Sequence, residues 1–201
     1  ATMESLDPVR FLTNHSSGKM GFAIAKEAML RGAEVTVVKA NTTAEIPNFV
    51  KIVEVSSAKD MFDAVTALSD QQDIIVKAAA VADYTPESYV DSKIKKKDGD
   101  LSISLKRTMD ILKYLGENKK EGQFLCGFSM ETDNMLENSK AQLSKKNADM
   151  IVANTLKDAG RGFKTDTNAV TMITRDGHRS LELKSKPEVA KEIFDEILGL
   201  I

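Results

Sequence analysis

Apolar and polar positions along this chain follow two rhythms that repeat in a fixed order. Residues 18–31 place apolar side chains at helical spacing, and Gly32 follows as a stop signal. The next run, EVTVV (34–38), has the short apolar pattern of a strand. The same alternation predicts further elements: strand 50–55, helix 57–70, strand 73–81, helix 110–118, strand 123–130, helix 134–147 and strand 149–154. We therefore predict an α/β fold with a Rossmann-like, doubly wound and mostly parallel sheet.

Two stretches depart from this order and predict antiparallel additions. Residues 98–107 (DGDLSISLKR) alternate with period two after a turn signal, and residues 169–185 form two strand-like runs joined by an Asp-Gly hairpin signal. The last segment, 186–201, has Pro187 near its first turn, as helices often do. Its apolar stripe consists of Val189, Ile193, Ile197 and Leu198. We expect this segment to dock as a closing helix.

The front of the chain lacks the element that normally opens such a fold. A doubly wound sheet has a central strand before its first loop and helix, yet residues 1–17 contain no strand-like apolar run. We predict that residues 1–201 form one domain and that its first strand is missing from this chain, which is then an N-terminally incomplete fragment.

Composition excludes several classes of protein. The 28 basic and 30 acidic residues nearly cancel to a net charge of −2, so nothing in the overall balance favours nucleic acid or an anionic membrane as a partner. No apolar run approaches the roughly 20 residues of a membrane span, and no signal peptide pattern opens the chain. We expect a cytoplasmic protein.

Cysteine and histidine give no catalytic or metal-binding pattern. Cys126, the one cysteine, lies in the apolar run QFLCGF and is expected to pack as a small hydrophobic residue. His15 and His178 lie in unrelated segments without a second ligand at metal spacing, so a zinc site built by the protein is not expected.

The loop TNHSSGKMG (13–21) raises the question of whether it binds a phosphate. It matches neither the P-loop, because Met20 follows Lys19, nor the dinucleotide-binding glycine pattern. Asn14, Ser17 and Gly18 nevertheless put polar groups and open backbone N–H groups at a helix N-terminus, which favours an anion. An ordinary serine cap explains the same residues, and the spacing alone does not decide between the two.

Two further stretches are candidates for contact with a ligand. Asp83 follows the strand DIIVKA, where ligands of open α/β sheets bind, and can accept from ribose hydroxyls or hold a cation bound to phosphates. The run SKIKKK (92–97) has four lysines in five residues and suits a polyphosphate. A solvated loop carboxylate and a solvated charge run are the alternative readings. Likewise, Asp110 can simply cap a helix and Lys146 can complement a helix C-terminus.

Taken in order, these pieces resemble bacterial phosphopantothenoylcysteine synthetase, commonly the C-terminal half of a bifunctional coenzyme A biosynthesis protein. The resemblance covers essentially all 201 residues. It rests on the segments DPVRFLTNHSSGKMG, AAAVADY, KIKK, MDIL, GFSMET and KKNADMIVAN.

The resemblance implies a two-step ligation in coenzyme A biosynthesis. The carboxylate of 4'-phosphopantothenate attacks the α-phosphate of CTP, and L-cysteine then displaces CMP from the acyl-cytidylate. Mg²⁺ would accompany the CTP, and FMN would be involved only if a flavin-dependent decarboxylase domain is fused upstream. For such chemistry the protein chiefly has to position the reactants and stabilise the charge that develops. The family also implies a homodimer, for which runs 101–106 and 169–184 are candidate contacts.

The resemblance carries roles onto individual residues. Asn14 matches the asparagine needed to convert the acyl-cytidylate, Lys93 the lysine needed to form it, and Arg10 an arginine on the substrate side. Expected nucleotide-binding residues are Ser17, Gly18, Asp83, Lys93, Met109, Asp110, Ile111, Leu112, Phe128, Gln142 and Lys146. Expected substrate-binding residues are Arg10, Asn14, Ala79 and Ala80, and Asp83 is the candidate metal contact through nucleotide-bound magnesium.

The chain departs from the family pattern at two of these positions. Gln142 stands where relatives often carry a second lysine, and Met109 stands where a proline is common. Three other functions remain open from the residues alone: a ligase that prefers ATP, a non-catalytic nucleotide-binding domain, and an NAD(P)-binding oxidoreductase, which the missing glycine fingerprint disfavours.

Overall fold

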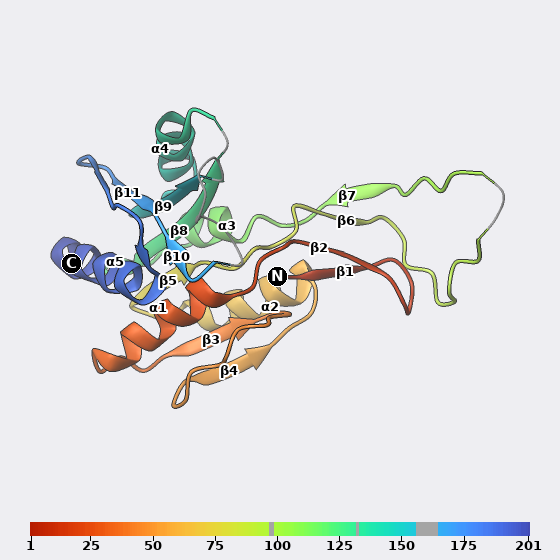
Figure 1. Cartoon of the computed structure of the whole chain (residues 1–201), viewed down its shortest axis with the longest axis horizontal. Helices are drawn as coiled ribbons and strands as arrows, with labels where there is room; N and C mark the ends of the chain where they lie inside the picture. The colour runs from red at the N-terminus through yellow and green to blue at the C-terminus, as the bar shows by residue number, and fades with distance from the viewer. Residues whose placement is uncertain (97–98, 132, 156–164) are drawn as a thin grey trace.

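The computed structural model of this chain describes residues 1–96, 99–131, 133–155 and 165–201 (Figure 1). Lys97, the last lysine of the basic run, lies outside them. The helices are α1 (Lys19–Leu30), α2 (Ala58–Ser69), α3 (Ile111–Glu117), α4 (Met135–Lys145) and α5 (Lys186–Leu200). The strands are β1 (Met3–Ser5), β2 (Phe11–Thr13), β3 (Thr36–Lys39), β4 (Lys51–Glu54), β5 (Ile74–Lys77), β6 (Tyr84–Pro86), β7 (Leu105–Arg107), β8 (Phe124–Glu131), β9 (Met150–Thr155), β10 (Thr167–Asn168), β11 (Val170–Thr174), β12 (His178–Ser180) and β13 (Lys184–Ser185).

Five strands form the central sheet in the order β12-β11-β9-β8-β5. The strands β5, β8 and β9 are parallel, and β11 and β12 form the predicted antiparallel hairpin on one side. Leu125 and Cys126 of β8 and Met150 and Ile151 of β9 are at most 1% exposed. Strands covered on both faces need apolar side chains in every position, which explains their continuous apolar runs. The predicted α/β class is confirmed.

Cys126 packs inside this sheet, as predicted. Its side chain is fully buried, and burial raises the pKa of the thiol far above its ordinary value. Burial thus disfavours the thiolate, which is the reactive form of a cysteine.

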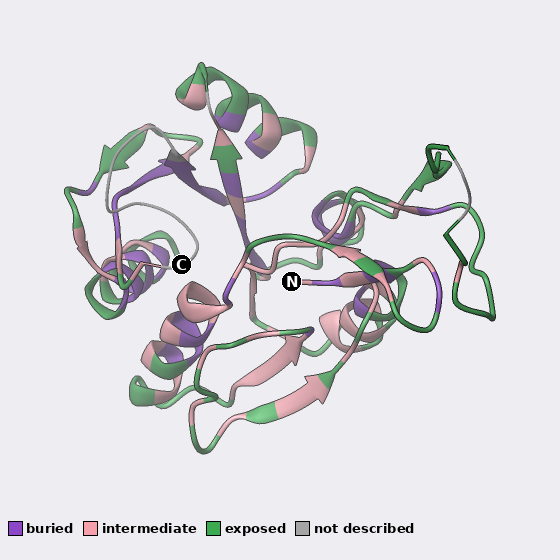
Figure 2. Cartoon of the chain, turned by 45° about the vertical axis from the view of Figure 1, so that its right-hand side comes forward, coloured by how far each residue is buried: buried purple, intermediate pink, exposed green. Residues whose placement is uncertain are grey.

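Helices cover both faces of the sheet. On one face, α1 and α5 pack together and join a core that includes Cys126, Met150 and Ile193. On the other face, α3 and α4 join a second core that includes Leu125 and Ile151 (Figure 2). Adjacent residues of β8 and β9 thus point into different cores, as strand geometry requires. This arrangement gives the sheet the two covered faces expected of a doubly wound fold.

The closing helix forms as predicted, with one difference in its stripe. Ser185 caps α5 in a capping box with Glu188, and Val189, Ile193 and Ile197 are completely buried. Leu198 is 50% exposed, so its place in the predicted stripe is wrong. It follows Ile197 by about 100° around the helix, which turns it away from the core.

The N-terminal segment contains two strands where none was predicted. β1 and β2 pair antiparallel over three residues each. The segment is fixed by polar contacts, because Thr2 and Glu4 are buried and their side chains accept the N–H groups of Ala82 and Ala58. An apolar run was the wrong signal here, because hydrogen bonds rather than apolar burial hold these strands. The strands β3 and β4 form a separate parallel pair.

The strands β6 and β7 are the base of an arm that extends from the body of the molecule (Figure 1). We call residues 87–104, between these strands, the arm loop. The predicted strand over 98–107 is confirmed only at Leu105–Arg107, and the last bond of the ladder runs from the N–H of Glu87 to the carbonyl of Ser104. Leu101 and Ile103 farther out are exposed, so no packing stabilises a longer strand there. Among the described residues, no helix has the length and apolar character needed to cross a bilayer.

Candidate active site

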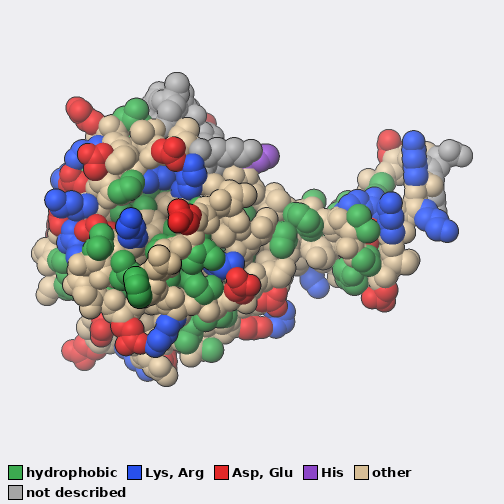
Figure 3. Space-filling model, turned by 60° about the horizontal axis from the view of Figure 1, so that its bottom comes forward, with side chains coloured by type: hydrophobic (Ala, Val, Ile, Leu, Met, Phe, Trp, Pro, Cys, Tyr) green, Lys and Arg blue, Asp and Glu red, His purple; other side chains and the backbone are tan. Residues whose placement is uncertain are grey.

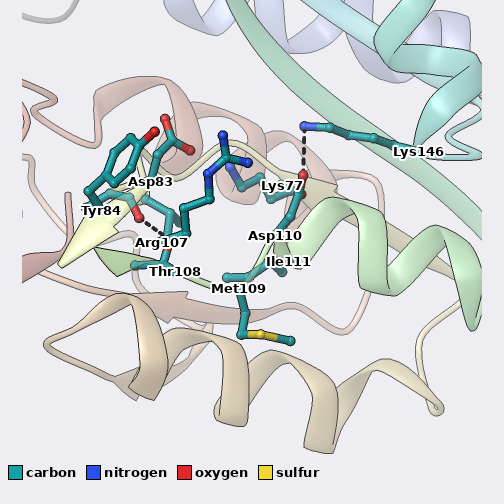
Figure 4. A pocket seen from close by; sticks show the side chains of 11 residues that line it. Lys77, Asp83, Tyr84, Arg107, Thr108, Met109, Asp110, Ile111 and Lys146 are labelled. Atoms are coloured by element: carbon teal, nitrogen blue, oxygen red, sulfur yellow. Dashed lines mark hydrogen bonds and ion pairs between the residues drawn. The ribbon is translucent and has the colours of Figure 1, made fainter. Parts of the chain in front are cut away.

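A cavity of about 350 Å³ opens beside the carboxyl end of β5 (Figure 4). Its lining comes from the end of β5, the loop into β6, the end of β7, the start of α3 and the residue after α4. The lining residues are Lys77, Val81, Ala82, Asp83, Tyr84, Arg107, Thr108, Met109, Asp110, Ile111 and Lys146. This is where ligands bind in open α/β sheets, outside the carboxyl ends of the strands.

Three cations and two carboxylates face this cavity: Lys77, Arg107, Lys146, Asp83 and Asp110. The Nζ of Lys146 lies 3.4 Å from Oδ2 of Asp110, and Oδ1 of Asp110 caps α3 by accepting the N–H of the third helical residue at 3.0 Å. Asp110 therefore does both things that the sequence suggested, since it caps a helix and lines the cavity. The lining carries a surplus of one positive charge, which suits an anionic ligand.

Lys77 and Arg107 are cavity residues that the sequence did not single out. Burial, and next the charge of Lys146, lower the pKa of Lys77, whereas Asp110 and Asp83 act in the opposite direction. A signal was available for Lys77, because a lysine that ends an apolar strand sits at the ligand-binding edge of a parallel sheet. For Arg107 there was none, since its place depends on the pairing of Tyr84 with Arg107 across the arm.

Five of the predicted nucleotide-binding residues come together in this cavity: Asp83, Met109, Asp110, Ile111 and Lys146. Leu112 and Phe128 are not among the residues that line it. Leu112 is 2% exposed and its side chain fills the space above Gly127, while Phe128 is half-buried against the core. Their contact with a nucleotide stays a prediction.

Gln142 does not line the cavity. Its Nε2 donates to Oε1 of Glu131 at 2.8 Å, and the other oxygen of Glu131 accepts from Asn138. Gln142 stands where relatives often carry a lysine, and its side-chain amide is therefore engaged in a hydrogen bond within the protein. Ala79 and Ala80, predicted to contact substrate, are half-buried, and the carbonyl of Ala80 accepts the N–H of Thr2 at 3.1 Å.

The predicted anion site at the start of α1 has an open first turn. Gly18 is the N-cap with φ of 82°, and no side chain makes a cap hydrogen bond there. A Cβ at Gly18 would lie 2.4 Å from Oγ1 of Thr42, which itself donates to the carbonyl of Ser17. The N-cap is thus a glycine and not a serine. Oγ of Ser17 accepts a long hydrogen bond, 3.5 Å, from the N–H of Lys19, and Asn14 is exposed.

Arg10 lies in the turn between β1 and β2 and Lys93 lies in the arm loop, so neither is part of the cavity lining. The guanidinium of Arg10 pairs with Asp7 and also donates to the carbonyl of Ile94 at 2.9 Å. Lys93, next to Ile94, is exposed. Figure 3 shows that Lys and Arg side chains gather on the outer part of the arm. The predicted site residues thus do not form one cluster, because they are divided among the cavity, the start of α1, the turn between β1 and β2, the arm loop and positions that line none of these.

The described residues hold no group of three or more His, Cys, Asp or Glu side chains that could bind a metal ion. Asp83 and Asp110 are the carboxylates that face the cavity. Magnesium prefers to keep waters and to bind one or two carboxylates together with substrate phosphates. These residues fit an ion that enters together with a nucleotide.

The doubly covered parallel sheet defines an α/β domain, and a cavity lined by three cations and two carboxylates lies at its carboxyl edge. Residues 1–200 match the DNA/pantothenate metabolism flavoprotein C-terminal domain family, to which the chain belongs. It is 47% identical over 201 residues to the coenzyme A biosynthesis bifunctional protein CoaBC of Bacillus subtilis (strain 168), covering 99% of this chain and 49% of that protein.

Two other similarities are comparable in extent. A cysteine/cysteine sulfinic acid decarboxylase from an unknown prokaryotic organism is 44% identical over 202 residues, covering 100% of this chain and 56% of that protein. The crystal structure of the C-terminal domain of a coenzyme A biosynthesis bifunctional protein CoaBC superposes with a TM-score of 0.83 at 45% identity, covering 99% of this chain and 90% of that one. The chain therefore spans about half the length of the full-length relatives it matches.

Proposed function

We propose that this domain joins 4'-phosphopantothenate to L-cysteine by way of an acyl-cytidylate, as a ligase of coenzyme A biosynthesis. The observation that carries the proposal is the cavity, where five residues expected to contact the nucleotide come together around three cations. Family membership supports it, and so do the relatives that are named for coenzyme A biosynthesis.

In the first step, a carboxylate oxygen of phosphopantothenate forms a bond to the α-phosphorus of the nucleotide, and pyrophosphate leaves. Negative charge builds up on the phosphates during this displacement. Lys146, Lys77 and Arg107 face the cavity and would offset that charge, while Asp83 would accept from ribose hydroxyls or hold magnesium that arrives with the phosphates. Lys93 on the arm is the further cation that the family resemblance assigns to this step.

In the second step, the amine of cysteine attacks the acyl carbon, CMP leaves and the amine loses a proton to give the amide. Carbonyl and phosphate oxygens of the intermediate need donors at this stage. The open first turn of α1 and the amide of Asn14 would supply them. Arg10 would orient substrate from the arm side in this assignment.

CTP is the proposed nucleotide, on the basis of the family resemblance, and ATP is the alternative. Ala82 and Met109 line the cavity, but both backbone groups of Ala82 already form hydrogen bonds with Thr2 and Thr108. Magnesium would enter with the nucleotide. FMN belongs to this proposal only in a longer polypeptide that also carries a flavin-dependent phosphopantothenoylcysteine decarboxylase.

The active form is proposed to be a homodimer. Of the two runs expected to form the contact, 101–106 is the better candidate because Leu101, Ile103 and Leu105 are exposed on the arm. In the other run, β11 is buried between β9 and β12, whereas β12 is exposed at the edge of the sheet. A partner strand could pair there only with the open edge of β12, whose exposed residues are polar.

Pyrophosphate release tests the proposal directly. The natural full-length polypeptide would be incubated with phosphopantothenate, magnesium and either CTP or ATP, with and without cysteine. We expect release with CTP that depends on phosphopantothenate, and continuous turnover only with cysteine present. Absence of pyrophosphate with both nucleotides would reject the ligase and leave a non-catalytic nucleotide-binding role.

Two variants separate the two steps. Asn14→Asp is expected to release pyrophosphate but to accumulate the acyl-cytidylate, whereas Lys93→Gln is expected to block pyrophosphate release. Asn118→Asp and Lys96→Gln are the control variants, because they make the same chemical changes at an exposed helix end and at another exposed lysine of the basic run. Accumulation of intermediate in Lys93→Gln would contradict the role given to that lysine.

A further inference from the structure

The carboxylate of Asp7 is surrounded by donors in the turn between β1 and β2. Its side chain is fully buried. Oδ1 accepts the backbone N–H groups of Val9 and Arg10 at 2.8 and 2.9 Å. Oδ2 accepts from Nε of Arg10 at 3.0 Å and from the N–H of Ile94 at 3.1 Å. A single carboxylate thus organises its own turn and reaches a residue 87 positions later in the chain.

Ile94 is held on both sides by this turn. Asp7 accepts its N–H, and Nη2 of Arg10, which also pairs with Asp7, donates to its carbonyl at 2.9 Å. A second contact lies close by, where the N–H of Val90 donates to the carbonyl of Leu6 at 3.1 Å. The turn between β1 and β2 therefore fixes the arm loop at two points.

Within residues 87–96 and 99–104, which the structure describes, the rest of the arm loop has little else to hold it. The strands β6 and β7 pair over three residues each, and the residues from Glu87 to Lys93 are exposed. A loop without packing samples many conformations, and every fixed point removes part of that freedom. Ile94 is the fixed point nearest to Lys93, because the two residues share a peptide bond.

We infer that Asp7 is a positioning residue for Lys93 and acts through the backbone of Ile94. Fixing both the N–H and the carbonyl of Ile94 sets the direction in which the preceding Cα presents its side chain. A lysine that must offset charge in the transition state gains from such preorganisation, because displacement by about 1 Å can cost on the order of 100-fold in rate. This inference rests on the proposed function, which assigns Lys93 to the first step.

The substitution that tests it is Asp7→Asn, which keeps the shape of the side chain. An amide keeps one acceptor oxygen and replaces the other by a donor, so it cannot accept both from the N–H groups of Val9 and Arg10 on one side and from the Arg10 guanidinium and Ile94 on the other. We expect the kcat of pyrophosphate release to fall by about 10- to 100-fold while the KM for the nucleotide stays within about threefold, since the cavity is untouched. Asp60→Asn is the matched control, because Asp60 also accepts backbone and hydroxyl hydrogen bonds, but from Ser57 in the capping box of α2. It is expected to leave kcat unchanged.

A double-mutant cycle asks whether Asp7 acts through Lys93. The cycle uses Lys93→Arg, which keeps the positive charge and so a measurable rate; if Asp7 acts through Lys93, the combined loss of rate of pyrophosphate release in the double variant is smaller than the product of the two single losses. Multiplicative effects of the two substitutions would overturn the inference, as would a full-rate Asp7→Asn enzyme. A wild-type protein that releases no pyrophosphate would instead reject the proposed function.

Hydrogen exchange at the Ile94 amide tests the contact without any activity. Asp7→Asn is expected to speed this exchange at least tenfold relative to wild type and to Asp60→Asn, and an unchanged rate would contradict the inference. Arg10→Lys serves if Asp7→Asn does not fold. This variant keeps the backbone hydrogen bonds of the turn but loses the guanidinium that donates to the carbonyl of Ile94. Amide hydrogen exchange in the arm loop is therefore again expected to be faster.

Discussion

Lys146 and Asp110 form an ion pair across the cavity, with Nζ and Oδ2 3.4 Å apart. The two residues come from different elements, since Lys146 follows α4 and Asp110 begins α3. The pair is partly exposed, so its own contribution to stability is small. The ion pair matters because it fixes the position of the Lys146 ammonium at the cavity. An incoming phosphate can then replace the carboxylate of Asp110 as the partner of that ammonium.

Lys146→Gln is expected to raise the KM for the nucleotide by about 10- to 100-fold, which corresponds to losing one charge-assisted hydrogen bond. Steady-state pyrophosphate release as a function of nucleotide concentration measures it. Lys145→Gln is the control, because this neighbour is exposed and does not line the cavity. Equal effects of the two substitutions would show that net charge alone matters.

Lys77 should make nucleotide affinity depend on pH. Burial lowers its pKa in the free protein, and a bound polyphosphate would raise it again, so binding takes up protons where the ammonium is partly deprotonated. Nucleotide affinity is therefore expected to fall as the pH rises, and to fall less steeply in Lys77→Met. Calorimetric titration at several pH values measures this. Lys39→Met, a strand-end lysine paired with Glu54, should keep the wild-type slope.

Gly18→Ala is expected to be more destabilising than Gly32→Ala. Both glycines have positive φ, which costs a non-glycine residue about 1–2 kcal/mol. An added Cβ at Gly32 meets nothing within 4 Å, whereas at Gly18 it lies 2.4 Å from Oγ1 of Thr42. The difference in free energy of unfolding, from denaturant titration, reports the steric part. Adding Thr42→Ala should recover some of the stability of Gly18→Ala, and no recovery would contradict the stated cause.

Asp7 should contribute stability that disappears in acid. Its hydrogen bonds with Arg10, and next those with backbone N–H groups, hold the pKa of the carboxyl well below its usual range, against the effect of burial. A depressed folded-state pKa gives stability that is present above the unfolded pKa of about 3.9 and is lost as the pH falls below it. Asp7→Asn should therefore lower the Tm at pH 7, and the gap to wild type should narrow below about pH 4. A gap that stays constant with pH would exclude this linkage.

Much of the fold was readable from local pattern. The continuous apolar runs around Cys126 and Met150 predicted buried parallel strands, and the Asp-Gly pair predicted the β11–β12 hairpin. The caps at Ser57 and Ser185 follow from residue chemistry within one turn of helix. The strands β1 and β2 were missed because polar side chains and distant backbone groups hold them, and no apolar periodicity marks such strands.

The candidate site was readable only in part. Asp83, Asp110 and Lys146 were identified by motif and do meet in one cavity. Arg107 was missed because its place depends on how the arm pairs, and Gln142 was expected at the nucleotide but is bound by Glu131.

The sequence by itself determined which segments are helices and which are buried strands, because these choices depend on side chains within about four residues of one another. The family motifs likewise identified individual candidate residues of the site. Only the tertiary structure decided which of them meet: it placed Lys77 beside Lys146 in the cavity and connected Asp7 to Ile94. Contacts between positions so far apart along the chain follow from the path of the backbone through the sheet and its arm, which no local pattern encodes.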